Sequence, residues 1–397
     1  MYLVKQEITI FKTGHLALVI ENRYFGEAGA QLTLQAVNRE VQMKNKNSGK
    51  RSAVCRKKRF MAGIAAAAFI FCQVISVPAA VYGAETGTAG AGPYDVILSV
   101  TDDTCTTQTV TWHDAGSATT GSVIFGTDRS AVEAARSTGV KTGVTEASGS
   151  RVEIKSGADL QCGVFSAGLT GLKADTIYYY YVESSSGKSG LKSFNTAAEN
   201  QETLSFAYLG DIQFQEDMKQ EYADWGQLIS GVYRKNPDLA FGILGGDIVQ
   251  SGIRVAEWDA FLENASPVFS SISMMSVNGN HESNMPGGKP EVYLDLFSLP
   301  QNGPEGFKEE FYSFDYGICH VTALNSWVFS GEQNLTAADY ERIHAWIEND
   351  LKNSKSTWNV VVMHHPVYAL ADDRVAEAVK ENWAPLFETY GVDLGFR

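Results

Sequence analysis

Four short apolar runs, each followed by a polar motif, recur in the second half of the chain, at residues 204–209, 239–244, 274–277 and 360–363. Near-continuous apolar runs of this length are typical of strands that are buried on both faces. Helical spacing of apolar residues appears between the runs, most clearly within residues 337–351. Strands that alternate with helices predict an α/β domain, with helices covering its sheets, over residues 203–397.

Residues 94–197 follow a different pattern, in which short strands alternate with turn residues. The predicted strands include residues 108–112, 122–125 and 178–182. Their spacing favours an all-β sandwich, so the fold class is two-domain, with this sandwich preceding the α/β domain. We expect the tyrosines at 178–181 to belong to the sheet surface and core, with no role in ligand binding.

Polar residues follow each of the four apolar runs of the α/β domain. Asp211 comes after the first run, Asp247 after the second, Asn280 and His281 after the third, and His364 after the fourth. The carboxyl ends of the strands in such a sheet meet at one edge, where the sites of α/β proteins form. One Asp after a strand is equally typical of a helix cap, but the ordered set predicts a site.

The donor types in this set indicate a transition-metal site. Carboxylate, amide and imidazole ligands together suit Fe, Mn or Zn better than the all-oxygen cage that calcium prefers. The set therefore predicts that the protein binds metal.

The motifs Gly-Asp211, Gly-Gly-Asp247, Gly-Asn280-His-Glu and Met-His364-His-Pro together resemble the calcineurin-like metallophosphoesterases. The β-domain before them, with the motifs that begin at Tyr312 (Tyr-Ser-Phe-Asp-Tyr-Gly) and Leu324 (Leu-Asn-Ser), narrows the resemblance to the purple acid phosphatases. It extends over residues 94–394.

Within the β-domain, residues 169–178 resemble the strand-turn-strand signature of fibronectin type III-like domains. This resemblance implies that Leu169 packs in the core and that Tyr178 closes the corner between two strands.

The resemblance also implies two divalent or trivalent metal ions as cofactors. Two such cations about 3.5–4 Å apart would activate a water molecule and neutralise phosphoryl oxygens. A role for each site residue follows. Asp247 would bridge the two metal ions, Asp211 would bind the first, and Asn280 and His364 would bind the second. Asn280 and His281 would contact the phosphate, and His281 would protonate the leaving group, while a metal-activated hydroxide attacks phosphorus in line. The implied function is metal-dependent hydrolysis of small phosphate esters, with phosphomonoesters as the first expectation and phosphodiesters or nucleotides as the alternative.

Two glutamines depart from the family pattern. Gln250 stands three residues after Asp247, where purple acid phosphatases carry the tyrosine that gives them their colour. Gln213, two residues after Asp211, stands where other metallophosphoesterases carry a histidine ligand. We expect Gln213 to bind the first metal through its amide oxygen, with a hydrogen-bonding role as the alternative.

The final family motif, Gly-His-x-His, is absent from the sequence, and the strand that would precede it begins near residues 391–394. We therefore interpret the chain as C-terminally truncated, with both metal sites weakened and a sheet edge left uncovered. Two alternatives remain at this stage, a secreted binding module with a vestigial phosphoesterase half and a nonfunctional gene fragment.

The remaining histidines are expected to be structural. His365 precedes a proline in a loop, His320 lies within an apolar strand, His344 lies in a predicted helix, and His113 belongs to the β-domain.

The segment before the β-domain carries a targeting pattern. Basic residues at 56–59 precede an uncharged stretch at 60–77, and small residues follow it. This order predicts a secretory signal peptide, and hence a secreted or cell-envelope protein. A membrane anchor is the alternative, but the stretch barely reaches the about 20 residues that a spanning helix needs.

The same pattern sets the predicted boundaries. The signal peptide occupies residues 43–84 and begins at Met43, and residues 85–93 form a linker. Residues 1–42 are predicted to be upstream sequence outside the folded product. No membrane association is expected after cleavage.

Charge narrows the set of partners. Residues 1–84 carry 12 basic and 4 acidic side chains, whereas the rest of the chain carries 20 basic and 42 acidic side chains. Such an acidic protein repels nucleic acid and anionic lipid, so no nucleic-acid binding is expected. A phosphate ester would be attracted by local positive charge, for which bound metal ions are the natural source. The sequence does not indicate an oligomeric state.

Three cysteines follow the predicted cleavage region, Cys105, Cys162 and Cys319. In an oxidising compartment Cys105 and Cys162 could pair, because both fall in the β-domain. Buried free thiols are the equal alternative.

Overall fold

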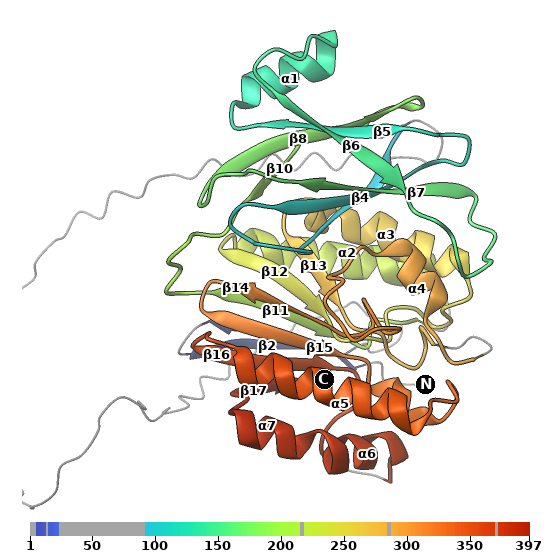
Figure 1. Ribbon diagram of the computed structural model, residues 1–397. Helices are drawn as coiled ribbons and strands as arrows, with labels where there is room; N and C mark the ends of the chain where they lie inside the picture. The colour runs from blue at the N-terminus through green and yellow to red at the C-terminus, as the bar shows by residue number, and fades with distance from the viewer. Residues whose placement is uncertain (1–4, 13–14, 24–91, 215–217, 284–286, 370–371) are drawn as a thin grey trace, which may run out of the picture.

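The computed structural model describes residues 5–12, 15–23, 92–214, 218–283, 287–369 and 372–397. Figure 1 shows a β-rich region packed on one side of a larger α/β region. The predicted signal peptide, and all of the predicted linker except residues 92 and 93, lie outside the described residues. Among the described residues, no helix has the length and apolarity that crossing a bilayer requires.

The β-rich region contains eight strands and one helix. They are β3 (Tyr94–Ser99), β4 (Gln108–Ala115), β5 (Gly121–Gly126), α1 (Arg129–Thr138), β6 (Thr145–Arg151), β7 (Cys162–Leu169), β8 (Ile177–Ser184), β9 (Gly187–Lys188) and β10 (Lys192–Asn195). Within this region the strands pair antiparallel. Its core is apolar, with Trp112 stacked on Phe165 at 5.6 Å between ring centroids.

The corner predicted in this region is confirmed. Leu169 is fully buried at the end of β7. Tyr178, on β8, accepts a hydrogen bond at its hydroxyl from the backbone N–H of Lys173, at 2.9 Å. The ring therefore closes the turn between the two strands, as the resemblance implied.

The first sheet of the α/β region is parallel. It is built from β11 (Ser205–Gly210), β12 (Leu239–Leu244) and β13 (Ser273–Ser276), which pair in that order. The helices α2 (Met218–Lys235) and α3 (Val255–Phe269) connect these strands, and α4 (Glu291–Leu296) follows β13. The three strands coincide closely with the predicted apolar runs.

The second sheet has four strands, β14 (Tyr312–Tyr316), β15 (Cys319–Leu324), β16 (Trp358–Met363) and β17 (Leu394–Phe396). The pair β14–β15 is antiparallel, and β15, β16 and β17 are parallel. After β15 come the 3₁₀ helix η1 (Ser326–Ser330) and α5 (Ala337–Asn353), and between β16 and β17 come α6 (Arg374–Asn382) and α7 (Ala384–Tyr390).

The two sheets of the α/β region pack face to face. Phe241 of the first sheet contacts Phe314 and Tyr316 of the second, with ring centroids 5.4 and 5.2 Å apart. The outer face of the second sheet is covered by α5, α6 and α7, as Figure 1 shows. Helix α5 begins with a capping box, in which the side chains of Thr336 and Asp339 each accept the other residue's backbone N–H.

The boundary between the two regions differs from a simple linker. β3 of the β-rich region pairs in parallel with β13, through Leu98 and Ser273, so that one sheet runs through both regions. The buried Tyr180 hydroxyl donates to the carbonyl of Ser270 at 2.7 Å. The carboxylate of Asp295 accepts the backbone N–H groups of Lys155 and Ser156. The β-rich region therefore contacts the α/β region at several separate positions.

A hairpin from the start of the chain extends the first sheet. β1 (Lys5–Lys12) pairs antiparallel with β11 and with β2 (His15–Arg23). The interpretation of residues 1–42 as upstream sequence stays a prediction.

The three cysteines of the described β-rich and α/β regions, Cys105, Cys162 and Cys319, are free thiols. The structure therefore favours the free-thiol alternative over a bond between Cys105 and Cys162.

Candidate metal centre

Three predicted ligands converge where the carboxyl edges of the two sheets meet. Asp211 follows β11, Asp247 follows β12, and His364 follows β16. Each offers one ligand atom, and the three atoms lie within 4.8 Å of one another. Asp247 is buried and His364 half-buried, whereas Asp211 faces solvent. The strand-end argument from the sequence thus leads to one physical cluster.

Both carboxylates sit on an unusual backbone. Asp211 and Asp247 each have a φ of 50°, in the left-handed region. For a residue other than glycine, this conformation costs on the order of 1 kcal/mol or more, and it persists only where its surroundings hold it. Here the two loops hold each other, because Ile212 and Gln213 both donate backbone N–H bonds of 3.0 Å to the carbonyl of Asp247.

The glycines of the motifs allow these loops to approach. A Cβ atom on Gly279 would lie 2.2 Å from Oδ1 of Asp247. A Cβ atom on Gly246, which has a φ of 88°, would lie 2.9 Å from Nδ1 of His364. The Gly-Gly-Asp and Gly-Asn-His motifs therefore carry glycine because any side chain there would fill the space between the ligands.

A hydrogen bond from Nδ1 orients the ring of His364. Nδ1 donates to the carbonyl of Gly245 at 3.0 Å, which turns Nε2 toward Oδ2 of Asp247 at 3.2 Å. Burial lowers the pKa of His364, but the hydrogen bond and charge of Asp247 outweigh it and raise that pKa to about 9. A cation bound between the two groups would take the place of that proton.

His281 lies beside the same carboxylate. Its backbone N–H donates to Oδ1 of Asp247 at 3.1 Å, and its Nε2 lies 3.7 Å from Oδ2. The ring nitrogen Nδ1 donates to the carbonyl of Gln250 at 2.6 Å, so Nε2 is the ring nitrogen that faces the Asp247 carboxylate. Asn280, the residue before it, is half-buried in the turn that follows β13.

The two glutamines provide further oxygen donors. Gln213 donates from Nε2 to Oδ2 of Asp247 at 3.3 Å. The side-chain oxygens of Gln213 and Gln250 are buried, and neither has a hydrogen-bond partner in the part of the chain that the structure describes. A buried amide oxygen without a partner costs free energy. The amide nitrogen of Gln213 thus makes the hydrogen bond that was the alternative to metal binding. Its unpartnered oxygen, and the carboxylate and imidazole groups of the cluster, are donor types that fit a metal ion.

Sequence reasoning assigned no role to Glu282, which the structure places under the cluster. It is fully buried and accepts hydrogen bonds from four backbone N–H groups, which belong to the loops that follow β12 and β13. Burial and the charge of Asp247 raise its pKa to about 7, against the effect of those N–H groups. Its position directly after Asn280-His281 was the only signal in the sequence.

The other histidines lie outside the cluster, as predicted. His365 is bonded to the Ser326 hydroxyl and stacked on Trp327, and burial with the charge of His364 lowers its pKa to about 4. His320 is bonded to two aspartates. His344 lies on the exposed face of α5, and His113 is buried in the β-rich region.

Comparison with known families follows the same division of the chain. Residues 93–196 match the purple acid phosphatase N-terminal domain, and residues 204–397 match the calcineurin-like phosphoesterases. By these two domains, the chain belongs to the purple acid phosphatase-like group of the calcineurin-like phosphoesterases. The match of residues 93–196 is to the purple acid phosphatase domain, and the fibronectin type III identity stays a prediction.

Curated relatives of this chain are distant. An uncharacterized protein of Mycobacterium tuberculosis is 24% identical over 343 residues, which cover 78% of this chain and 61% of the relative. Purple acid phosphatase 15 of Arabidopsis thaliana is 27% identical over 263 residues, which cover 57% of this chain and 46% of the relative. The chain thus spans about half of the length of the relatives that it matches.

Solved structures share the fold. A purple acid phosphatase from seeds of yellow lupin (Lupinus luteus) superposes with a TM-score of 0.58 at 18% identity, over 77% of this chain and 58% of that one. PhoD superposes with a TM-score of 0.54 at 12% identity, over 78% of this chain and 72% of that one. At these identities the likeness shows the arrangement of strands and helices alone.

Proposed function

We propose that the protein hydrolyses phosphate esters at a pair of metal ions bound where the two sheets meet. The observation that carries this proposal is the convergence of Asp211, Asp247 and His364 within 4.8 Å, at the sequence positions that the family motifs predict. Asp247 would lie between the two ions. Asp211 and Gln213 would hold the first ion, and Asn280 and His364 the second.

The bound ions would supply positive charge for the phosphoryl oxygens and an activated water. The side chains would orient the ions and the substrate and would protonate the leaving group. Asp247 is held by the N–H of His281 on one oxygen and faces His364 with the other, so its carboxylate is oriented before any ligand arrives. Burial raises the pKa of this carboxyl, but the hydrogen bond and charge of His364 and the charge of His281 outweigh it and lower that pKa. It is therefore ionised at neutral pH.

His281 is placed to protonate the departing oxygen. With Nδ1 committed to the carbonyl of Gln250, Nε2 faces the cluster and is the atom that meets a substrate. The side chain is 24% exposed, which leaves a path for a small ester from solvent. Phosphomonoesters are the proposed substrates, and a larger diester or nucleotide is the alternative within the same chemistry.

The decisive experiment combines metal analysis with an activity assay. Purified protein loaded with Mn²⁺, Fe or Zn²⁺ is expected to hydrolyse p-nitrophenyl phosphate. Asp247→Asn is expected to lower the rate at least 100-fold and to reduce the bound metal, because it removes the charge that offsets the repulsion between two cations.

Asp128→Asn is the control, since Asp128 caps α1 in the β-rich region and asparagine caps equally well. Full activity in Asp247→Asn would refute the bridging role. Folded protein that binds no transition metal would instead support the binding-module alternative. Secretion remains a prediction, to be tested by sequencing the N-terminus of the mature protein.

A further inference from the structure

Glu282 has the most completely satisfied carboxylate near the metal centre. Its Oε2 accepts the backbone N–H groups of Asp247 and Gly279, at 2.8 and 2.7 Å. Its Oε1 accepts those of Ile248 and Val249, at 2.7 and 3.1 Å. The residue has no exposed surface. A buried carboxylate is costly unless it is fully hydrogen-bonded, so a residue placed here needs all four donors.

These four donors come from two different loops. Asp247, Ile248 and Val249 begin the loop after β12, which carries the proposed bridging ligand. Gly279 precedes Asn280, a proposed ligand of the second ion, in the loop after β13. Each oxygen accepts at least one N–H from the Asp247 loop, and Oε2 joins the N–H of Asp247 itself to that of Gly279.

The carboxylate also compensates for the conformation of Asp247. The left-handed φ of 50° at this residue leaves three successive N–H groups pointing the same way, an arrangement that binds anions. Glu282 fills this anion site from within the protein. The N–H groups are thus occupied, and the strained backbone is held in place.

We propose that Glu282 is a positioning residue, which sets the distance between the two metal sites by fastening the Asp247 loop and the Asn280 loop to one carboxylate. The effect on the metal sites rests on the proposed function. The connection between the two loops rests on the hydrogen bonds of Glu282 alone. Glu282 is not a ligand, because its two oxygens are both occupied by backbone donors.

The test compares three full-chain variants with the unmodified protein. Glu282→Gln keeps the size but points an NH₂ group at backbone N–H donors, and Glu282→Asp keeps the charge but shortens the reach. Asp295→Asn is the matched control, because Asp295 is also buried and also accepts two backbone N–H groups, at a distance from the metal centre.

Two measurements are made on each protein, amide hydrogen exchange and Mn²⁺ binding by titration calorimetry. In Glu282→Gln, exchange at residues 247–249 and 279 is expected to be at least 10-fold faster. The affinity for Mn²⁺ is expected to fall about 10–100-fold, as for other residues that orient metal ligands. Glu282→Asp is expected to fall between these values. Asp295→Asn is expected to lower the melting temperature with unchanged Mn²⁺ affinity.

The outcomes separate this inference from the proposed function. Unchanged exchange at residues 247–249 and 279 in Glu282→Gln would overturn the fastening. Unchanged Mn²⁺ affinity, with stability lowered as in Asp295→Asn, would overturn the positioning role. If the unmodified protein binds no Mn²⁺ while exchange in Glu282→Gln is faster, the proposed function fails and the fastening of the loops is supported.

Discussion

At the scale of single residues, the proposed metal centre includes glutamines as well as acids. Gln250 replaces the aromatic side chain that the family resemblance led us to expect, and its buried amide oxygen has no partner in the described parts of the chain. An amide oxygen is a neutral, hard donor, whereas a tyrosinate is an anion that transfers charge to ferric iron. If two ions bind as proposed, such neutral donors would favour divalent ions over ferric iron at the first site.

Iron-loaded protein is accordingly expected to lack an intense visible absorption band. Gln250→Tyr is expected to introduce one, since it restores the missing phenolate at that position. The absorption spectrum of both proteins, loaded with iron under identical conditions, tests this. Metal-free Gln250→Tyr is the control and should be colourless, and an intense band in the unmodified protein would contradict the assignment.

The site residues differ in how far the sequence could predict them. Asp211, Asp247 and His364 could be predicted because each follows an apolar strand, and parallel strands bring their carboxyl ends together. Glu282 could not, because its partners are backbone N–H groups, which have no signature in the sequence. The left-handed conformation of the two aspartates also depends on bonds between loops that are far apart in the chain.

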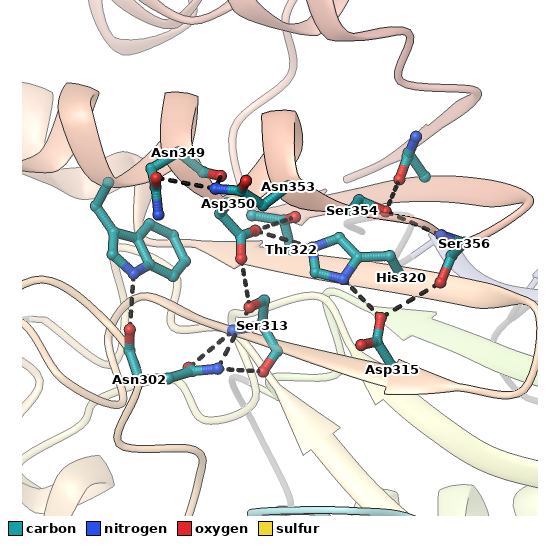
Figure 2. A network of polar contacts seen from close by, with 12 residues as sticks. Asn302, Ser313, Asp315, His320, Thr322, Asn349, Asp350, Asn353, Ser354 and Ser356 are labelled. Carbon is teal, nitrogen blue, oxygen red and sulfur yellow. Dashed lines mark hydrogen bonds and ion pairs between the residues drawn. The ribbon is translucent and has the colours of Figure 1, made fainter.

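At the scale of elements, His320 joins the β14–β15 hairpin to helix α5. Figure 2 shows its ring between two carboxylates, with Nδ1 bonded to Asp315 at 2.8 Å and Nε2 to Asp350 at 3.0 Å. Asp350 also accepts bonds from the hydroxyls of Ser313 and Thr322. The network borders a cavity of about 630 Å³ at the end of the sheet where β15 begins. A ring that donates from both nitrogens is a cation.

This network predicts a loss of stability in alkaline solution. Burial lowers the pKa of His320, but the bonds to Asp315 and Asp350 outweigh it and raise the folded-state pKa from 6.5 to about 9. The stabilisation is therefore fully present below pH 6.5 and is lost as the pH rises through about 9. We expect about 2 kcal/mol, less than the full shift implies, because the Asp315 side chain is 71% exposed and is screened by solvent.

Urea unfolding at pH 6 and at pH 9.5 measures this effect. At pH 6 the free energy of unfolding of His320→Gln is expected to be lower than that of the unmodified protein. Between pH 6 and pH 9.5 it is expected to fall less than that of the unmodified protein. His344→Gln, on the exposed face of α5, is the control and should behave as the unmodified protein. Equal pH dependence in His320→Gln would rule out the network as its source.

At the scale of the whole molecule, the two regions form one continuous structure. The sequence could predict the sandwich and the α/β domain separately, because their hydrophobic periods differ. It could not predict the shared sheet, since the pairing of Leu98 with Ser273 is a single parallel contact that leaves no pattern. The bonds from Lys155 and Ser156 to Asp295 likewise join residues about 140 positions apart.

We expect the two regions to unfold in one cooperative transition. Amide exchange in β4 reports on the β-rich region and exchange in β12 on the α/β region, and their unfolding midpoints in denaturant should coincide. Asp295→Asn is expected to lower both midpoints together and to reduce the free energy of unfolding by about 1–3 kcal/mol, because it removes the buried carboxylate that accepts the N–H groups of Lys155 and Ser156. A separate, earlier transition in β4 would show that the regions are independent.

The backbone at Asp211 and Asp247 decides which substitutions can be interpreted. A φ of 50° is tolerated by asparagine, which visits the left-handed region more often than other residues with a side chain, whereas alanine is strained there. Asparagine variants therefore remove charge while preserving the loop, and alanine variants mix loss of a ligand with collapse of its support. The same constraint means that exchange of aspartate for asparagine is the substitution by which either position can change its charge without straining its loop.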